Sequence, residues 1–303
     1  MSKKILVGLN NSPLDEKVLK FASYLSKASG CPLTLLHANE KPISHPTIPD
    51  VPELAEIVKQ AADRQLSEAK AYLTKISESL SCESEVLLVT NNPAAAIIEE
   101  AKTSEYLWVI TGASSHPKNV FFKSMSCNLS LYNKTDIPVI TVNKDLELPK
   151  EGEPLRVLAT EDLTSSSHVK ESAGDLLKAL KEKCDVKVVH VSPITEKELG
   201  IERSLPGGFK HESKKPIEES MKIVDKACRT LLEKKYEIKD FAKQDFSIKH
   251  GNVKESIKEE ISSFKPHLVI FGSHKKVHFD PIYLGKIPFS TAFEFGTPFM
   301  ITP

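Results

Sequence analysis

The chain has 303 residues, of which 27% are charged and 40% are hydrophobic, and its 41 basic residues equal its 41 acidic ones in number. This composition is typical of a soluble globular protein with one large domain or two ordinary ones. The net charge of zero argues against a protein built mainly to bind nucleic acid, because that function needs a basic surface that displaces counterions.

The first residues and the cysteines indicate the cellular compartment in which the protein is expected. The apolar run in MSKKILVGLNNSP is too short for a signal peptide, and no stretch reaches the roughly 18 apolar residues of a membrane helix. The five cysteines include no C-x-x-C pair. This fits reduced thiols and indicates neither a disulfide framework nor a zinc site. We expect a cytoplasmic protein with no metal site, no membrane partner and no nucleic-acid partner.

In the first half, five short apolar runs alternate with segments of helical periodicity. We predict strands at residues 4–9, 33–38, 85–90, 106–111 and 138–142. The helix after the second strand is the clearest, because Leu54, Ile57, Ala61 and Leu66 begin a series of apolar residues at helical spacing. The strand runs are continuously apolar rather than alternating, which is typical of parallel strands covered on both faces.

The second half repeats this order of elements. We predict its strands at residues 155–160, 186–191, 244–249, 267–272 and 298–302. The polar segment 144–154 is the predicted linker between a first domain, residues 1–145, and a second domain, residues 152–303. The sequence therefore predicts an α/β protein of two tandem flavodoxin-like or Rossmann-like units. Each is expected to be a five-stranded parallel sheet with helices on both faces.

Polar residues and glycines recur at the predicted strand ends of both halves. In such sheets, ligands bind beyond the carboxyl ends of the strands, near the point where the strand order reverses. The corresponding residues in the two halves are Asn10 and Asp162, His37 and His190, and Gly112 and Gly272. The pattern identifies no nucleophile or carboxylate partner for the histidines, so we expect them to pack or to form hydrogen bonds.

A series of landmarks in each half resembles the universal stress protein family. The first half carries ILVGLNNS, LTLLHA, NNPAAAIIEEA, LWVITGASS and TDIPVITV, and the second carries RVLATEDLT, VKVVHVS, GNVKESIKEE, LVIFGSHK and GTPFMIT. The resemblance implies the sheet described above, pairing between domains and a role in surviving stress or growth arrest. Some members of this family bind ATP or AMP, and others bind no nucleotide.

Nucleotide-binding members carry a glycine after the fourth strand, then two residues, a second glycine, nine residues and Gly-Ser or Gly-Thr. Glycines let backbone N–H groups approach phosphate oxygens at the start of a helix. In the first half, Ser115 replaces the second glycine and Met125 the third, and we expect the methionine side chain to obstruct a phosphate. The binding residues that the resemblance implies in this half are Asn10, Ala38, Gly112 and Ser126.

The second half departs less from the family pattern. Lys275 replaces the middle glycine and Lys286 the hydroxyl residue, and lysines can bind phosphate as point charges. Pro288 removes one backbone donor from the start of the next helix. The resemblance implies that Asp162 holds ribose and that the backbone of Val191 holds adenine. The full set of implied residues is Asp162, Val191, Gly251, Gly272, Gly285 and Lys286, so this half is the better candidate for ATP or AMP.

The expected function is that of a non-enzymatic binding or scaffold protein of the stress response, with degenerate nucleotide sites and either no cofactor or ATP/AMP. The alternative is an ATP-binding switch with slow hydrolysis. A purely structural interaction protein, or a binder of another small molecule, also fits. His274 and His278 lie in a predicted loop without an adjacent Glu, so we expect no metal there. Expected partners are the other half of the same chain, a second copy or an unknown protein.

Overall fold

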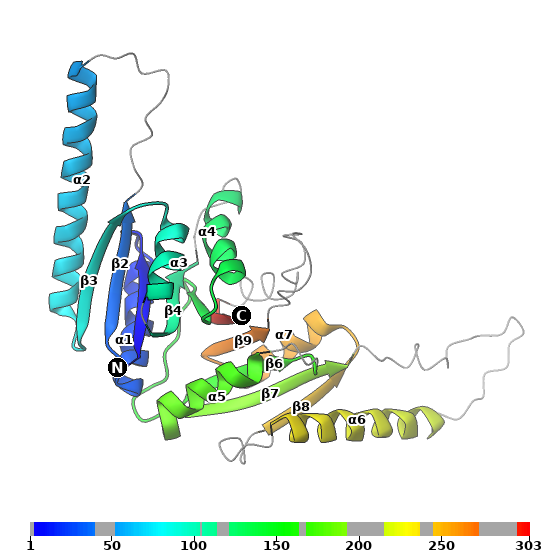
Figure 1. Ribbon diagram of the computed structural model, residues 1–303. Coiled ribbons are helices and arrows are strands. Elements are labelled where there is room, and N and C mark those ends of the chain that lie inside the picture. The colour runs from blue at the N-terminus through cyan, green and yellow to red at the C-terminus, as the bar shows by residue number, and fades with distance from the viewer. Residues whose placement is uncertain are drawn as a thin grey trace, which may run out of the picture. The chain divides into compact units, whose positions relative to one another are not determined.

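The computed structural model describes residues 3–39, 52–103, 105–113, 121–163, 168–192, 215–236, 245–272 and 296–303 (Figure 1). Contacts between residues divide the chain into two units. The first contains residues 1–146, 298–301 and 303, and the second contains residues 147–297 and 302. The predicted limits of the two domains stay a prediction, and each unit is described separately below.

The first unit is a parallel sheet with helices on both faces. Its strands are β1 (Lys4–Leu9), β2 (Leu33–Asn39), β3 (Ser84–Thr90), β4 (Tyr106–Gly112) and β5 (Val139–Val142). Its helices are α1 (Asp15–Ser29), α2 (Pro52–Ser79), α3 (Pro93–Thr103) and α4 (Phe121–Lys134). The strand order is β3-β2-β1-β4-β5, so the order reverses between β1 and β4.

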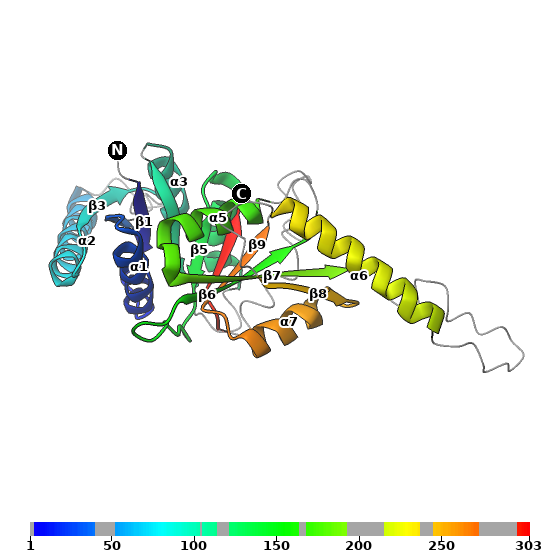
Figure 2. The ribbon, with the colours of Figure 1, turned by 90° about the horizontal axis from the view of Figure 1, so that it is seen from below.

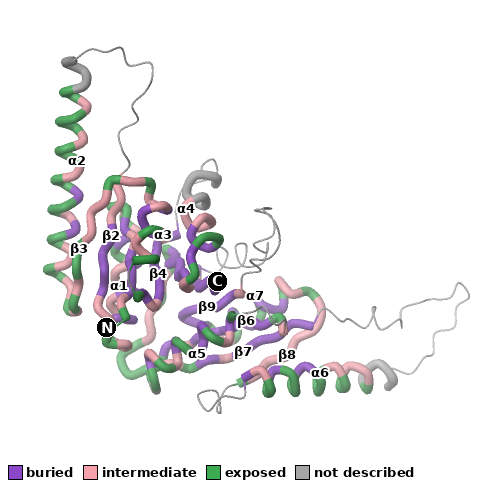
Figure 3. The backbone as a smooth tube through the Cα atoms, viewed as in Figure 1, coloured by how far each residue is buried: buried purple, intermediate pink, exposed green. Residues whose placement is uncertain are grey.

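The order of the strands determines which face of the sheet each helix covers. Because parallel crossovers are right-handed, α1 and α2 pack on one face of the sheet, and α3 and α4 pack on the other (Figure 2). The central strands β1 and β4 are largely buried between these layers, whereas no residue of the edge strand β3 is buried (Figure 3). Ile5, Leu6 and Val7 of β1 are fully buried on both faces, which explains why the strand is apolar at successive positions.

The second unit repeats the arrangement. Its strands are β6 (Leu155–Glu161), β7 (Cys184–Ser192), β8 (Asp245–His250) and β9 (Leu268–Gly272). Its helices are α5 (Val169–Leu180), the short 3-10 helix Lys181–Lys183, α6 (Lys215–Lys235) and α7 (Val253–Phe264). The strands pair in parallel in the order β9-β6-β7-β8, which matches the order β4-β1-β2-β3 of the first unit. The predicted class, two tandem α/β units with parallel strands, is confirmed.

The last strand, β10 (Phe299–Thr302), corresponds by sequence to the fifth strand of the second half. It pairs with β5 in the antiparallel direction, with Met300 opposite Ile140, and contacts place residues 298–301 in the first unit. All four residues of β10 are buried. The apolar sequence predicted the strand, but its partner and direction come from tertiary packing.

Among the described residues, no helix combines the length and the hydropathy that crossing a membrane requires.

Candidate functional site

A pocket of about 240 Å³ opens at the carboxyl ends of β1 and β4, where the strand order of the first unit reverses. Three of the four residues predicted for this half line it, namely Asn10, Ala38 and Gly112. The fourth, Ser126, lies in α4 next to Cys127, which also lines the pocket. The side chain of Ser126 is outside the part of the chain that the structure describes. The parallel sheet thus brings distant strand ends into one site, as ligand sites in such folds require.

The loop from β1 to α1 forms one wall of the pocket and is held by the carboxylate of Asp15. Asp15 Oδ2 accepts hydrogen bonds from the backbone N–H of Asn11 at 2.8 Å and of Asn10 at 3.2 Å. Asp15 Oδ1 accepts one from Ser12 Oγ at 3.2 Å. Asn11 has a φ of 58°, a left-handed conformation that asparagine adopts more readily than most residues. Asp15 begins α1, where the helix dipole favours a negative charge.

Tyr72 of α2 completes the environment of this carboxylate. Its hydroxyl donates a hydrogen bond to Asp15 Oδ2 at 2.9 Å. Burial, together with the charge of Asp15, raises the pKa of Tyr72 well above its ordinary value, so the phenol stays a donor. Sequence reasoning missed both residues. The only local signal was an acidic residue in the first turn of a predicted helix, and nothing pointed to a tyrosine 57 positions away.

Asn128 of α4 fixes the other wall of the pocket. Its Oδ1 accepts a hydrogen bond from Thr111 Oγ1 at 3.1 Å, and its Nδ2 donates to the carbonyl of Gly112 at 3.2 Å. A Cβ atom at Gly112 would lie 2.8 Å from Cδ2 of Leu14, so the leucine side chain would have to shift to admit one. Packing against Leu14 therefore favours a glycine at this position independently of any ligand.

The thiol of Cys127 is unsuited to nucleophilic chemistry. Burial raises the pKa of this thiol to about 11, so the reactive thiolate is scarce near neutral pH. Asn10, the exposed polar residue at the end of β1, carries no charge. The described part of this pocket offers hydrogen-bonding groups and apolar walls.

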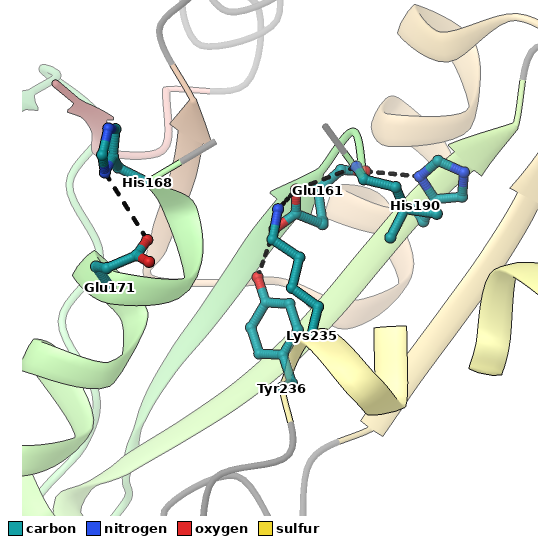
Figure 4. Close-up of polar contacts among 7 residues, drawn as sticks. Glu161, His168, Glu171, His190, Lys235 and Tyr236 are labelled. Atoms are coloured by element: carbon teal, nitrogen blue, oxygen red, sulfur yellow. Dashed lines mark hydrogen bonds and ion pairs between the residues drawn. The ribbon is translucent and has the colours of Figure 1, made fainter. Parts of the chain in front are cut away.

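The corresponding edge of the second unit is organised by Glu161, the last residue of β6 (Figure 4). Its side chain is fully buried and accepts hydrogen bonds from Lys235 Nζ at 2.9 Å and from the Tyr236 hydroxyl at 2.9 Å. The backbone N–H of Leu163 donates a third at 3.1 Å. Burial and the neighbouring carboxylate raise the pKa of Tyr236 far above its ordinary value. A buried carboxylate is stable here because it is paired with a cation and hydrogen-bonded.

The two units hold this loop by different residues. Leu163, with a φ of 62°, occupies the position that Asn11 has in the first unit. The N–H of Leu163 donates to the carboxylate of Glu161 in the preceding strand, whereas the N–H of Asn11 donates to the carboxylate of Asp15 in the following helix. In both units, a tyrosine donates a hydrogen bond to that carboxylate.

The strand-end histidines have the expected hydrogen-bonding role. Nδ1 of His37 lies 3.0 Å from the carbonyl oxygen of Leu9, and Nδ1 of His190 lies 2.8 Å from that of Glu161. In each case the ring nitrogen donates, because a carbonyl oxygen can only accept. The two histidines tie the ends of neighbouring strands together.

The remaining second-half candidates lie at the carboxyl ends of neighbouring strands. Asp162 follows β6 and is exposed, Val191 is buried near the end of β7, and Gly272 ends β9. Gly251 follows β8 with a φ of 98°, a conformation that favours glycine without any ligand, and its N–H donates to Ser192 O at 3.0 Å. Outside the described residues lie Gly285, Lys286, Lys275, Pro288, His274 and His278.

Within the parts of the chain that are described, no three His, Cys, Asp or Glu side chains gather in a group that could hold a metal ion.

The family model of the universal stress protein family matches residues 1–143. Among solved structures, a universal stress protein from Archaeoglobus fulgidus DSM 4304 is similar over 100% of this chain and 96% of its own, with a TM-score of 0.64 and 16% identity. A functionally unknown protein from Pseudomonas aeruginosa PAO1 is similar over 99% and 92%, with a TM-score of 0.63 and 14% identity. At these identities the structural likeness supports the fold alone. The comparison with curated proteins found no match.

Proposed function

We propose that this chain, whose residues 1–143 match the family model of the universal stress protein family, is a non-enzymatic binding protein of the stress response. Its ligands would be adenine nucleotides or their nucleosides, bound at the carboxyl ends of the strands. The observation that carries this proposal is the pocket beside β1 and β4, which is lined by Asn10, Ala38 and Gly112. It lies where ligands bind in doubly wound sheets.

The size of the pocket bears on the ligand. Its volume of about 240 Å³ is below the roughly 300–1,000 Å³ typical of sites that enclose a drug-sized ligand. The described part of the site therefore suits a nucleoside portion better than a whole triphosphate. In the second unit, the acidic Asp162 beside β6 supports the expectation that this half binds nucleotide better, because a carboxylate can accept hydrogen bonds from both ribose hydroxyls.

A non-enzymatic role is supported by the hydrogen bonding and the protonation of the reactive groups around the first pocket. The carboxylate of Asp15 already accepts bonds from two backbone amides, Ser12 and Tyr72. A general base must instead be free to take a proton from a substrate. The raised pKa values of Tyr72 and Cys127 keep both groups protonated.

We also propose that the two repeats pair within one chain, in the cytoplasm. The antiparallel register of β5 and β10, the corresponding last strands of the repeats, supports this pairing. Sedimentation velocity of the purified chain tests it, since a dimer at micromolar concentration would favour pairing between chains instead.

Isothermal titration of the full chain with adenosine, AMP and ATP tests the binding proposal. Ala38→Leu fills the first pocket, and Ala61→Leu adds the same atoms at an exposed position of α2 as its control. Asp162→Ala removes the carboxylate of the second site. We expect binding that Ala38→Leu or Asp162→Ala weakens at least tenfold and Ala61→Leu leaves unchanged. No heat with any ligand at millimolar concentration, or binding that survives both site substitutions, would contradict the proposal.

A further inference from the structure

Two of the five cysteines lie at matching places on neighbouring strands of the first unit. Cys31 is two residues before Leu33, the first residue of β2, and Cys82 is two residues before Ser84, the first residue of β3. Leu33 and Ser84 are paired in the parallel register, and the N–H of Leu33 donates to the carbonyl of Glu83 at 2.9 Å. The two cysteines therefore precede neighbouring strands, by the same number of residues, at the amino edge of the sheet.

The spacing of neighbouring strands is compatible with a disulfide between the segments that lead into them. Neighbouring strands lie about 4.8 Å apart, and the Cα atoms of bridged cysteines are about 4.4–6.8 Å apart. Side chains two positions apart on a strand point to the same face. Ser84 faces α2, because its hydroxyl lies 2.8 Å from that of Ser77. Cys31 and Cys82 lie in the connections that lead into these strands, two residues before Leu33 and Ser84 respectively.

The turn before β2 holds Cys31 in place. Ser26 Oγ donates to the carbonyl of Cys31 at 2.6 Å, and the N–H of Cys31 donates to Ser29 Oγ at 3.3 Å. Gly30, with a φ of 75°, ends α1 and turns the chain toward the strand. Both cysteine residues are partly exposed, so a small oxidant can reach them.

We propose that Cys31 and Cys82 form a reversible disulfide when the protein meets hydrogen peroxide. One thiolate attacks a peroxide oxygen, the O–O bond breaks, and a sulfenic acid and water form. The second thiol attacks the sulfenic sulfur, the S–O bond breaks, and a second water leaves as the S–S bond forms. Two thiols and one peroxide thus yield one disulfide and two waters. A low-molecular-weight dithiol restores both thiols by exchange.

The other three cysteines provide controls within the same chain. Burial raises the pKa of Cys127 to about 11 and of Cys184 to about 12, and it also raises the pKa of Cys228. Cys184, the first residue of β7, is the repeat counterpart of Cys31 by sequence, because both lie six residues before the strand-end histidine of their half, His190 or His37. The counterpart of Cys82 is Ala242, so the second unit lacks the partner thiol.

The bridge would close the segment that contains β2 and α2 at the amino edge of the sheet. The pocket of the proposed function lies at the opposite, carboxyl edge. Oxidation is therefore expected to raise the resistance of this outer layer to proteolysis and unfolding, because a cross-link restricts the unfolded chain. It should leave ligand binding unchanged.

The test is to treat the full chain with hydrogen peroxide, remove the oxidant, count free thiols and map disulfide-linked peptides by mass spectrometry. The count should fall from five to three, and the linked peptides should contain Cys31 and Cys82. Cys31→Ser and Cys82→Ser should each prevent the bridge, and Cys184→Ser should leave it intact. If Cys31→Ser or Cys82→Ser fails to fold, the other of these two variants is enough for the test. Five free thiols after treatment, a bridge between another pair, or linkage only between chains would overturn the proposal.

Discussion

Removing the cation from the buried Glu161–Lys235 pair should destabilise the second unit more than most surface substitutions. The carboxylate is fully buried, Lys235 is 20% exposed, and Nζ lies 2.9 Å from Oε1. Replacing Lys235 with Met keeps most of the side-chain volume and removes the cation from a buried carboxylate that still accepts hydrogen bonds from Leu163 N–H and the Tyr236 hydroxyl. Breaking a buried pair typically costs about 3–5 kcal/mol, and partial exposure of Lys235 places our expectation near the lower end, about 3 kcal/mol.

The matched background is Glu161→Gln, which removes the charge but keeps the shape and one accepting oxygen. In this background, Lys235→Met should cost about 1 kcal/mol or less, so the coupling in the double-mutant cycle is about 2 kcal/mol. Urea unfolding followed by far-UV circular dichroism measures each free energy of unfolding. An equal cost of Lys235→Met in both backgrounds would show that the pair is uncoupled and would refute this reasoning.

Three further predictions concern single groups. Tyr72→Phe removes a donor from the carboxylate of Asp15 and should lower the free energy of unfolding by about 1.5–3 kcal/mol; urea unfolding that gives a loss below about 0.5 kcal/mol would contradict it. Burial lowers the pKa of His267, so the neutral form is favoured in the folded state. The contribution of His267 to the free energy of unfolding is complete above the unfolded pKa of about 6.5 and declines as pH falls below it. Thermal melts at successive pH values should show a smaller loss of stability toward low pH for His267→Gln than for the unmodified chain. Gly112→Ala places a Cβ 2.8 Å from Cδ2 of Leu14 and should cost about 1 kcal/mol in urea unfolding, and Leu14→Ala should remove that cost.

The sequence by itself determined the architecture. The predicted strands agree with the observed ones to within two residues at each end. The central strands are recognisable without any partner, because buried parallel strands are apolar at successive positions. The repeat, with Asn10 matching Asp162 and His37 matching His190, predicted two units of the same kind. Parallel strands carry their carboxyl ends to one edge, so Asn10 and Gly112 could be assigned to one site, and the family resemblance added Ala38. All three line one pocket.

Only the tertiary structure decided what surrounds each strand end. The carboxylate of Asp15 is 57 positions from Tyr72, and that of Glu161 is 75 positions from Tyr236. Each pair meets because a crossover helix packs across the sheet. Local periodicity reports burial and backbone type, but it carries no information about which distant side chain completes a buried polar group. The partner of β10 was hidden for the same reason, since an apolar strand can pair at either edge and in either direction. Long-range packing supplied the partners, whereas the chain's own pattern supplied the elements.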